Sequence, residues 1–363
     1  MIEVIKNFIF FSNVGIFFIA TILLTLGVVL YYPKLFILFG RPSYSGIQVI
    51  HENLTPRLGG LIIFLGILGF YLFSGSLLLN YKGSNLLSSL LIFGGVISLL
   101  TAREDIFHNS SPMYRIVSIS FPTFLFFYVG NYNLPLIDIP ILGDFLSVPI
   151  FAFLFYSFAV TSVSNGFNMI DGANGVAGTS LICSFFCLLF LSVSVNDFSI
   201  SIISCVYIVF ILAFLIFNYP FGKIFLGDSG AYFLGFSVSA LLIVFFGRNN
   251  DVSPWNAILI LFFPIMETIF SVIRKYFFEK ISPFEPDPHH LHAKIYFLMK
   301  DSRLTSSKQN NNLVLPFLSI VWATPLLLMP WVFEQNFLII GFIIVVAIGY
   351  VMFYSFIPRH KTD

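Results

Sequence analysis

The chain has 363 residues, of which 58% are hydrophobic and only 10% are charged, and its mean hydropathy is +0.95. Soluble domains carry roughly 25% charged residues, so this composition excludes an ordinary soluble protein and indicates an integral membrane protein. The formal net charge is +1 and no basic tract occurs, which argues against nucleic acid as a partner.

Long apolar stretches recur along the whole chain. A transmembrane helix needs about 20 apolar residues, and strands of a membrane barrel would alternate polar and apolar residues, which these stretches do not. We therefore predict an all-α polytopic membrane protein, a single domain over residues 1–363 with about 11 transmembrane helices. The predicted spans are 9–31, 58–80, 86–102, 116–131, 147–164, 178–194, 199–218, 230–247, 255–274, 313–330 and 336–357.

The basic residues give this topology an orientation. With eleven spans, fifteen of the 18 Lys and Arg residues fall on one face, and only Lys6, Lys82 and Arg248 fall on the other. Cytoplasmic loops carry the excess of basic residues. The face with fifteen basic residues is therefore predicted to be cytoplasmic, and the C-terminus lies on that side.

The segment Asn165–Gly175 is the most informative polar stretch, with three asparagines, three glycines and one aspartate between apolar runs. Backbone N–H and C=O groups without hydrogen-bond partners are not tolerated in the lipid hydrocarbon, so the segment lies at a membrane face or lines a water-filled cavity. Glycines let the backbone approach a ligand, and amides and a carboxylate supply directional hydrogen bonds. The alternative is a plain turn between two helices, for which Asn and Gly are the usual residues.

Four further polar motifs fall on the same predicted face. A functional site at that face is favoured, because the loops on the other face carry no comparable group of polar residues. The four motifs are His51–Gly60, Arg103–Asp105, Gly227–Gly230 and Pro286–His292.

The adjacent acids Glu104 and Asp105 follow a predicted span. Neighbouring carboxylates repel each other, and a divalent cation or a proton relieves that cost. The alternative is a solvated acidic pair whose charge is balanced by Arg103 and Arg115.

Asp228 lies in the short motif Gly227–Gly230, where a predicted span begins. Mg²⁺ binds proteins through one or two carboxylates together with phosphate oxygens of a substrate, so Asp228 is a candidate metal ligand. Asp228 and Ser229 can equally act as the N-cap of the following helix.

Three histidines, His289, His290 and His292, follow Asp287 in the long predicted loop Lys275–Asn312. Their spacing matches no standard zinc pattern, and no cysteine accompanies them. A histidine can also serve as the partner of a phosphate or a leaving group, and nearby basic residues make the loop attractive to anions.

Glu267 is the one acid placed well inside a predicted span. Acids within the membrane are functional candidates by default. Because Glu267 lies only about two turns before Arg274, it can reach the cytoplasmic cavity or pair locally, and we favour a structural role.

Together these segments resemble the polyprenyl-phosphate N-acetylhexosamine-1-phosphate transferases, the membrane family that includes the phospho-N-acetylmuramoyl-pentapeptide transferases. The matching segments occur in the order of the family. They are Thr55–Gly60, Glu104-Asp105 with Ser111–Arg115, Asn165–Gly175 with Ala177, Gly227–Gly230 with Leu234-Gly235, and Ser282-Pro283-Phe284 leading to Asp287, His290, Leu291 and His292.

The resemblance implies a bacterial inner-membrane enzyme with its active site facing the cytoplasm. Such an enzyme moves a sugar 1-phosphate from a UDP-N-acetylhexosamine to undecaprenyl phosphate, releases UMP and initiates O-antigen or another cell-envelope glycan. UDP-GlcNAc is the first expectation for the donor, and a FucNAc donor is the alternative. The resemblance also implies Mg²⁺ as cofactor, with Mn²⁺ as an alternative, and a homodimer.

The resemblance also implies roles for individual residues. It makes Asp228 the metal ligand, and makes Asp105, with Glu104, the group that deprotonates or positions the lipid phosphate. Asn168 and Asp171 are expected on the nucleotide, and His290, His292 and Arg274 on the diphosphate or sugar. The full set of expected substrate-binding residues is Asn165, Asn168, Asp171, Arg274, His289, His290, His292 and Arg57.

Three positions depart from the family pattern. Glu104 stands where the family has Asp, Ala293 stands where many relatives have another histidine, and Glu267 stands where relatives commonly have Asp. The departures at Glu104 and Ala293 leave room for a changed sugar selectivity.

A membrane transporter of a small solute is the alternative from another functional class. A transporter is expected to carry polar or broken spans near the middle of the bilayer, often in two repeated halves. Here the polar motifs gather at one face and no internal repeat is present, so the sequence favours the transferase.

Overall fold

The computed structural model describes residues 2–39, 55–78, 84–107, 110–135, 137, 139, 142–285, 287, 289–301 and 307–358. These residues are mostly helical and contain no strand, which confirms the predicted all-α class. Residues 51–54 of the first polar motif lie outside the described residues.

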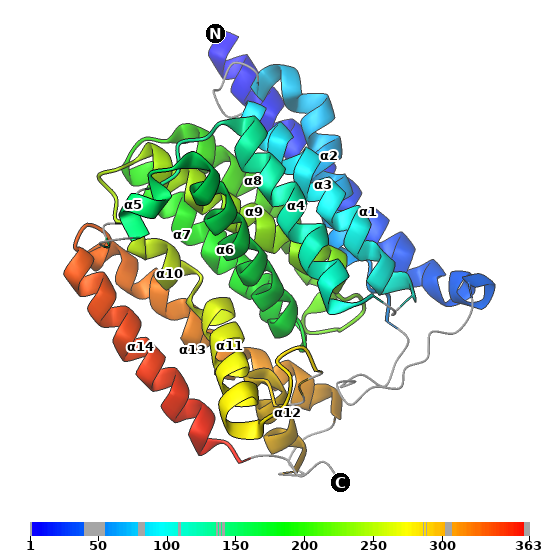
Figure 1. Cartoon of the computed structure of the whole chain (residues 1–363). Helices are drawn as coiled ribbons and strands as arrows, with labels where there is room; N and C mark the ends of the chain where they lie inside the picture. The colour runs from blue at the N-terminus through cyan, green and yellow to red at the C-terminus, as the bar shows by residue number, and fades with distance from the viewer. Residues whose placement is uncertain are drawn as a thin grey trace.

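Figure 1 shows the helices as a bundle, with the start of α1 and the end of α14 at opposite ends of it. In chain order the elements are α1 (Ile2–Phe39), α2 (Gly59–Leu78), α3 (Ser84–Phe107), α4 (Pro112–Gly130), α5 (Leu142–Leu146), α6 (Pro149–Ile170), α7 (Val176–Ser194), α8 (Phe198–Asn218), α9 (Gly227–Arg248), α10 (Trp255–Ile260), α11 (Phe262–Ile273), the π-helix η1 (Arg274–Glu279), α12 (Leu291–Asp301), α13 (Ser307–Val332) and α14 (Asn336–Phe356).

The chain is a polytopic membrane protein. Among the described residues, nine helices are long and apolar enough to cross a membrane, and α2 contains a shorter apolar helical segment. Every one of the eleven predicted spans coincides with a helix, although 255–274 is divided between α10 and α11. The exact number of crossings stays a prediction.

The division between α10 and α11 has a local cause. Leu261 separates the two helices with φ −97° and ψ 19°, outside the helical region. Pro264 then occupies the first turn of α11. Proline has no N–H and fits best in a first turn, where the backbone N–H has no helical partner. Helices α4 and α13 nevertheless carry prolines in their interior, so Pro264 favours the division at Leu261 without requiring it.

Helix α9 is the centre of the bundle. It packs against α2, α3, α4, α6 and α7, and every residue from Gly227 to Gly247 is buried. A helix without a polar stripe is stable where other helices surround it on all sides. Its first turn, which carries Asp228, therefore lies among the ends of the helices around it.

The starts of α2 and α9 meet at two glycines. A β-carbon on Gly60 would lie 1.9 Å from the α-carbon of Gly230, so only glycine permits this approach. The amides of Gly59 and Gly60 donate to the carbonyls of Phe225 and Leu226, each at 2.9 Å. This pairing brings the segment before α2 against the segment before α9.

Two predicted spans end too early. Helix α3 continues beyond 86–102 to Phe107, so Glu104 and Asp105 lie in its last turn and not on a loop. Helix α6 continues beyond 147–164 to Ile170, so the first half of Asn165–Gly175 is helical. Hydropathy detects the hydrocarbon layer, whereas backbone hydrogen bonds carry a helix on into polar surroundings.

The predicted long loop Lys275–Asn312 contains helical segments, although none of its described residues before Asn310 belongs to a candidate membrane span. The π-helix η1 follows α11 directly, α12 covers Leu291–Asp301, and α13 already begins at Ser307. η1 and α12 are short and of mixed polarity, so hydropathy alone does not detect them.

We expect Gly60→Ala to lower the thermal stability of the purified protein by several degrees. The added methyl group meets the backbone of Gly230, and overpacking of this kind costs about 1–3 kcal/mol. Thermal unfolding in detergent measures the change.

Gly341→Ala on α14 is the matched control, because nothing lies within 4 Å of a β-carbon there. Alanine is a better helix former than glycine by about 1 kcal/mol, so this variant should keep or raise stability. Equal effects of the two variants would contradict the close contact of α2 with α9.

Candidate active site

Two acids and two arginines meet at the first turn of α9; we call Arg57, Asp105, Arg115 and Asp228 the carboxylate–arginine cluster. Arg57 Nη2 donates to Asp228 Oδ1 at 2.9 Å, and its Nε lies 3.5 Å from Asp105 Oδ1. Arg115 Nη1 lies 4.0 Å from Asp228 Oδ2. The acid side chains are buried, whereas those of Arg57 and Arg115 are 34% and 31% exposed. Both arginines can therefore meet an anion from outside.

Asp105 holds the start of α9. Its Oδ1 accepts the amide hydrogen of Asp228 at 2.8 Å, and its Oδ2 accepts that of Ser229 at 2.9 Å. A negative charge is stabilising at a helix N-terminus, where the first amides have no helical partner. The N-cap position is Leu226, which makes no side-chain cap bond. The alternative that Asp228 or Ser229 caps this helix is therefore wrong.

Asp228 keeps one carboxylate oxygen without a hydrogen bond. Oδ1 is taken by Arg57, but Oδ2 is buried and has no hydrogen-bond partner among the described residues. A buried polar oxygen in that state is costly, and a cation or a water that enters the site would relieve the cost. The geometry thus fits the predicted metal ligand.

Asp171 ends α6 beside this cluster. Burial raises the pKa of Asp171 to about 8; Arg57 opposes the rise, and the carboxylates of Asp228 and Asp105 add to it. Asp171 therefore belongs to one acidic group with Asp105 and Asp228, and Arg57 balances part of its charge.

The two predicted asparagines of α6 point to different neighbours. Asn168 Nδ2 donates to the hydroxyl of Tyr232 on α9 at 2.9 Å, beside the carboxylate–arginine cluster. Asn165 Nδ2 lies 3.5 Å from Met169 Sδ, which also receives the hydroxyl of Thr268 on α11 at 3.6 Å. Asn168 therefore joins the cluster, whereas Asn165 lies toward α11.

Glu104 turns away from Asp105. Its Oε2 accepts the amide hydrogen of Ser110 at 2.7 Å, in the connection between α3 and α4. Successive residues of a helix point in different directions, about 100° apart. The two acids that are adjacent in sequence therefore have different partners, and Asp105 alone contacts α9.

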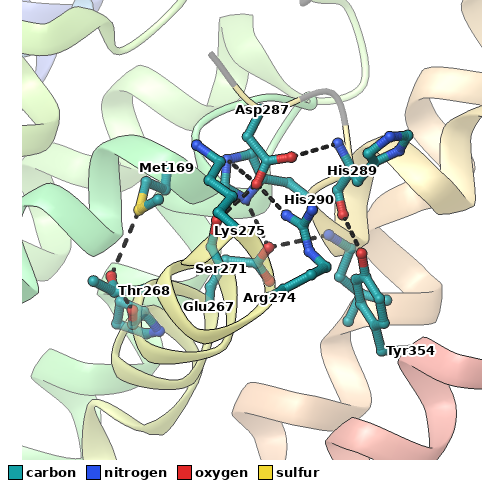
Figure 2. A network of polar contacts seen from close by, with 12 residues as sticks. Met169, Glu267, Thr268, Ser271, Arg274, Lys275, Asp287, His289, His290 and Tyr354 are labelled. Atoms are coloured by element: carbon teal, nitrogen blue, oxygen red, sulfur yellow. Dashed lines mark hydrogen bonds and ion pairs between the residues drawn. The ribbon is translucent and has the colours of Figure 1, made fainter. Parts of the chain in front are cut away.

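A second group of polar side chains, shown in part in Figure 2, lies where η1 and the start of α12 meet. We call it the histidine cluster: Glu267, Arg274, Asp287, His290 and His292. Asp287 is its centre, because Oδ2 accepts the hydroxyl hydrogen of Ser271 at 2.7 Å and pairs with Arg274. Oδ1 of Asp287 accepts the backbone amide of His289 at 2.9 Å.

The charges around Asp287 determine its protonation. Burial opposes ionisation, but the charge of His290, the Ser271 hydrogen bond and Arg274 together lower the pKa of Asp287 to about 2. Asp287 is thus a fixed negative charge near neutral pH. Arg274 also pairs with Glu279 at 2.7 Å and its side chain is only 4% exposed. The described contacts of Arg274 are therefore internal ion pairs.

The three predicted histidines have different environments. The backbone of His289 contacts Asp287, while its ring points away from that carboxylate (Figure 2). The rings of His290 and His292 stack with centroids 5.7 Å apart and planes 10° apart. No group of three or more His, Cys, Asp or Glu suited to a metal occurs among the described residues.

Gly172 joins the two clusters. A β-carbon on Gly172 would lie 1.8 Å from His292 Nε2, so the imidazole rests directly on this glycine. Gly172 follows Asp171, which belongs to the acidic group at α9. The segment Asn165–Gly175 therefore touches the carboxylate–arginine cluster at one residue and the histidine cluster at the next.

Sequence reasoning missed several members of the site. Arg115 and Asp287 were not predicted to act, although both lie in motifs that were identified. Tyr232 and Tyr350 lie within apolar spans, where a tyrosine carries no signal in a single sequence. The hydroxyl of Tyr350 pairs with Glu267, a polar residue inside a predicted span that needs a partner. The hydroxyl of Tyr232 pairs with Asn168, which lies in the polar segment after the span 147–164.

Comparisons with known proteins find a matching family and several similar chains. A family model described as "Glycosyl transferase family 4" matches residues 87–281. A Bacillus subtilis (strain 168) protein, "Probable undecaprenyl-phosphate N-acetylglucosaminyl 1-phosphate transferase", is 25% identical over 281 residues, 77% of this chain and 76% of the relative.

Two further relatives carry the name "Undecaprenyl-phosphate alpha-N-acetylglucosaminyl 1-phosphate transferase". The protein from Yersinia pestis is 26% identical over 263 residues, which cover 71% of this chain and 69% of the relative. The protein from Salmonella typhi is 27% identical over 285 residues, which cover 77% of this chain and 74% of the relative.

We expect Asp105→Ala to destabilise the protein by about 2 kcal/mol, as the loss of a good helix cap does. The change removes both acceptors at the start of α9 and one partner of Arg57. Thermal unfolding in detergent tests this.

Glu104→Ala serves as the neighbouring control, since it removes only the acceptor of the Ser110 amide. A smaller loss of stability is expected from it. If Asp105→Ala unfolds at the temperature of the unmodified protein, the capping role of Asp105 is refuted.

Proposed function

Because the chain belongs to glycosyl transferase family 4, we propose that it transfers a sugar 1-phosphate from a UDP-sugar to undecaprenyl phosphate. The lipid phosphate oxygen attacks the β-phosphorus of the donor, and the bond from that phosphorus to the bridging oxygen breaks. The products are polyprenyl-diphosphate-sugar and UMP. The resemblance of the polar motifs, the family match and the names of the relatives support this reaction.

One observation carries the proposal: two partly exposed arginines and buried acids lie together at the end of the bundle, at the start of its most buried helix. A lipid anchored in the bilayer can present its phosphate at that level, and a soluble nucleotide sugar can approach from the water. Arg57 and Arg115 have the exposure and the charge to hold phosphate groups.

The transfer brings like charges together. A phosphate monoester has a second pKa of about 6, so the lipid phosphate is largely dianionic near pH 7 and needs charge compensation more than it needs a base. Positive side chains and preorganised dipoles provide such compensation. We therefore propose that Asp105 acts in the site by positioning Asp228 and Arg57.

Mg²⁺ is the proposed cofactor, with Mn²⁺ as an alternative. Asp228 Oδ2, which is buried without a hydrogen bond, would hold the ion, and Asp171 lies in the same acidic group. A site with one or two carboxylates is typical of Mg²⁺ that is also bound by substrate phosphates. When bound, the ion would neutralise charge on the phosphates.

The other end of the site is proposed for the donor. Asn168 and Asp171 lie beside the carboxylate–arginine cluster, and we propose that they hold the nucleotide. His292 lies against Gly172 and His290 stacks on His292, and we propose that this pair of imidazoles serves the diphosphate or the sugar. Arg274 would support them by fixing Asp287, because its own contacts are internal.

The sugar, the pathway and the membrane side are further parts of the proposal. The relatives are named for N-acetylglucosaminyl phosphate, which favours UDP-GlcNAc, and a FucNAc donor is the alternative. The excess of basic residues favours a cytoplasmic site in a bacterial inner membrane, where the lipid product would initiate O-antigen or another envelope glycan. The homodimer stays a prediction.

We expect membranes that contain the protein to incorporate label from UDP-GlcNAc into a lipid that organic solvent extracts, and to release UMP. A panel of UDP-sugars with undecaprenyl phosphate identifies the preferred donor. Uptake of a solute into vesicles without any lipid product would favour the transporter instead.

Asp228→Asn should lower transfer at least 100-fold while the protein still accumulates in the membrane, because the amide cannot bind the cation as a carboxylate does. A chelator should abolish transfer by the unmodified protein, and added Mg²⁺ should restore it. Activity of Asp228→Asn close to that of the unmodified protein would remove this residue from the metal assignment.

A further inference from the structure

Glu267 is a buried acid with a complete set of donors. Its side chain lies in α11 and is 3% exposed, and its Oε1 is 2.9 Å from His290 Nδ1. The same oxygen accepts the amide hydrogen of Leu291 at 3.1 Å, and Oε2 accepts the hydroxyl hydrogen of Tyr350 at 2.5 Å. A buried carboxylate is tolerated when donors surround it in this way. Those donors come from the start of α12 and from α14.

This arrangement determines where His290 carries a proton. The partner of one ring nitrogen fixes the tautomer and the orientation of an imidazole. Because a carboxylate oxygen faces Nδ1, that nitrogen carries a proton in both the neutral ring and the imidazolium. Nε2 then points toward Asp287, whose Oδ2 is 3.7 Å away.

The orientation of His290 extends to the neighbouring histidine. His292 stacks on His290 with a centroid distance of 5.7 Å, and His292 Nε2 rests on Gly172. A rotation of the His290 ring would therefore disturb the contact of His292 with the segment that carries Asp171. Glu267 controls both imidazoles through one hydrogen bond.

The last helix completes the network. Tyr350 and Tyr354 are one turn apart on α14, and Tyr354 donates to the carbonyl of His289 at 2.8 Å. Lys294 Nζ donates to the carbonyl of Tyr354, also at 2.8 Å. Both tyrosines lie outside residues 87–281, the part of the chain that the family model matches.

We propose that Glu267 and Tyr350 are positioning residues that hold His290, and through it His292, against the donor part of the site. The proposal rests on the transferase function proposed above. By this proposal, α14 contributes a positioning residue to the active site, in addition to its role as a membrane helix.

Tyr350→Phe is the first test, because it removes one hydroxyl and keeps the ring. We expect kcat/KM for the UDP-sugar to fall about tenfold, while KM for polyprenyl phosphate stays unchanged. Tyr156→Phe is the matched control, because the Tyr156 hydroxyl is also buried and donates to the carbonyl of Pro135 at 2.5 Å. Tyr156 lies in the first half of α6, whereas the site residues Asn168 and Asp171 lie at the end of that helix. Equal losses in the two variants, or none in Tyr350→Phe, would overturn the proposal.

A double-mutant cycle separates positioning from general stability. Glu267→Gln should lower kcat/KM in the unmodified protein, yet cause no additional loss when His290→Asn is already present. Losses that multiply in the double variant would mean that Glu267 does not act through His290.

A spectroscopic test needs no activity. The chain has six histidines, so ¹⁵N-histidine NMR in detergent is tractable, and His290→Asn assigns the signal. We expect a protonated Nδ1 on His290, and loss of that state in Glu267→Gln. An unprotonated Nδ1 would refute the positioning role. A protein that makes no lipid product but gives the expected signal would refute the proposed function and leave the network established.

Discussion

The bond between the Asp105 carboxylate and the first amides of α9 is the constraint on which the site depends. It joins the end of α3 to the start of the most buried helix, and so fixes the direction of the Asp228 side chain. Arg57 binds both acids from the segment before α2, where the approach of Gly60 to Gly230 leaves no space for a side chain. Backbone contacts therefore set the spacing of the charges.

The two clusters divide the chemistry between them. The carboxylate–arginine cluster keeps an acceptor oxygen on Asp228 without a hydrogen bond, together with partly exposed arginines, as a site for a cation and phosphates requires. In the histidine cluster, by contrast, the contacts of Glu267, Arg274 and Asp287 satisfy one another inside the protein. That cluster is built to hold two imidazoles in place. Gly172 puts the two environments side by side.

The sequence predicted the helices well because long apolar runs have one stable form in lipid. It predicted that the polar motifs share one membrane face, because the Lys and Arg residues of the loops are concentrated on that face. It did not predict that Asp105 caps α9, because a contact between the end of one helix and the start of another has no local pattern. The sequence also did not predict the role of Tyr350. Its partner Glu267 is 83 positions away, and no local pattern relates the two residues. Helix ends were misplaced at α3 and α6, where polarity changes before the hydrogen bonding does.

The burial of α9 on all sides has a consequence for the protein in its natural setting. Helices such as α1 and α14 have most of their surface turned outward, and peripheral membrane helices accommodate changes in bilayer thickness by tilting. The first turn of α9 is shielded from such changes by the ring of helices around it. Lipids of different chain length should therefore alter how the acceptor enters far more than they alter the geometry of the cation site.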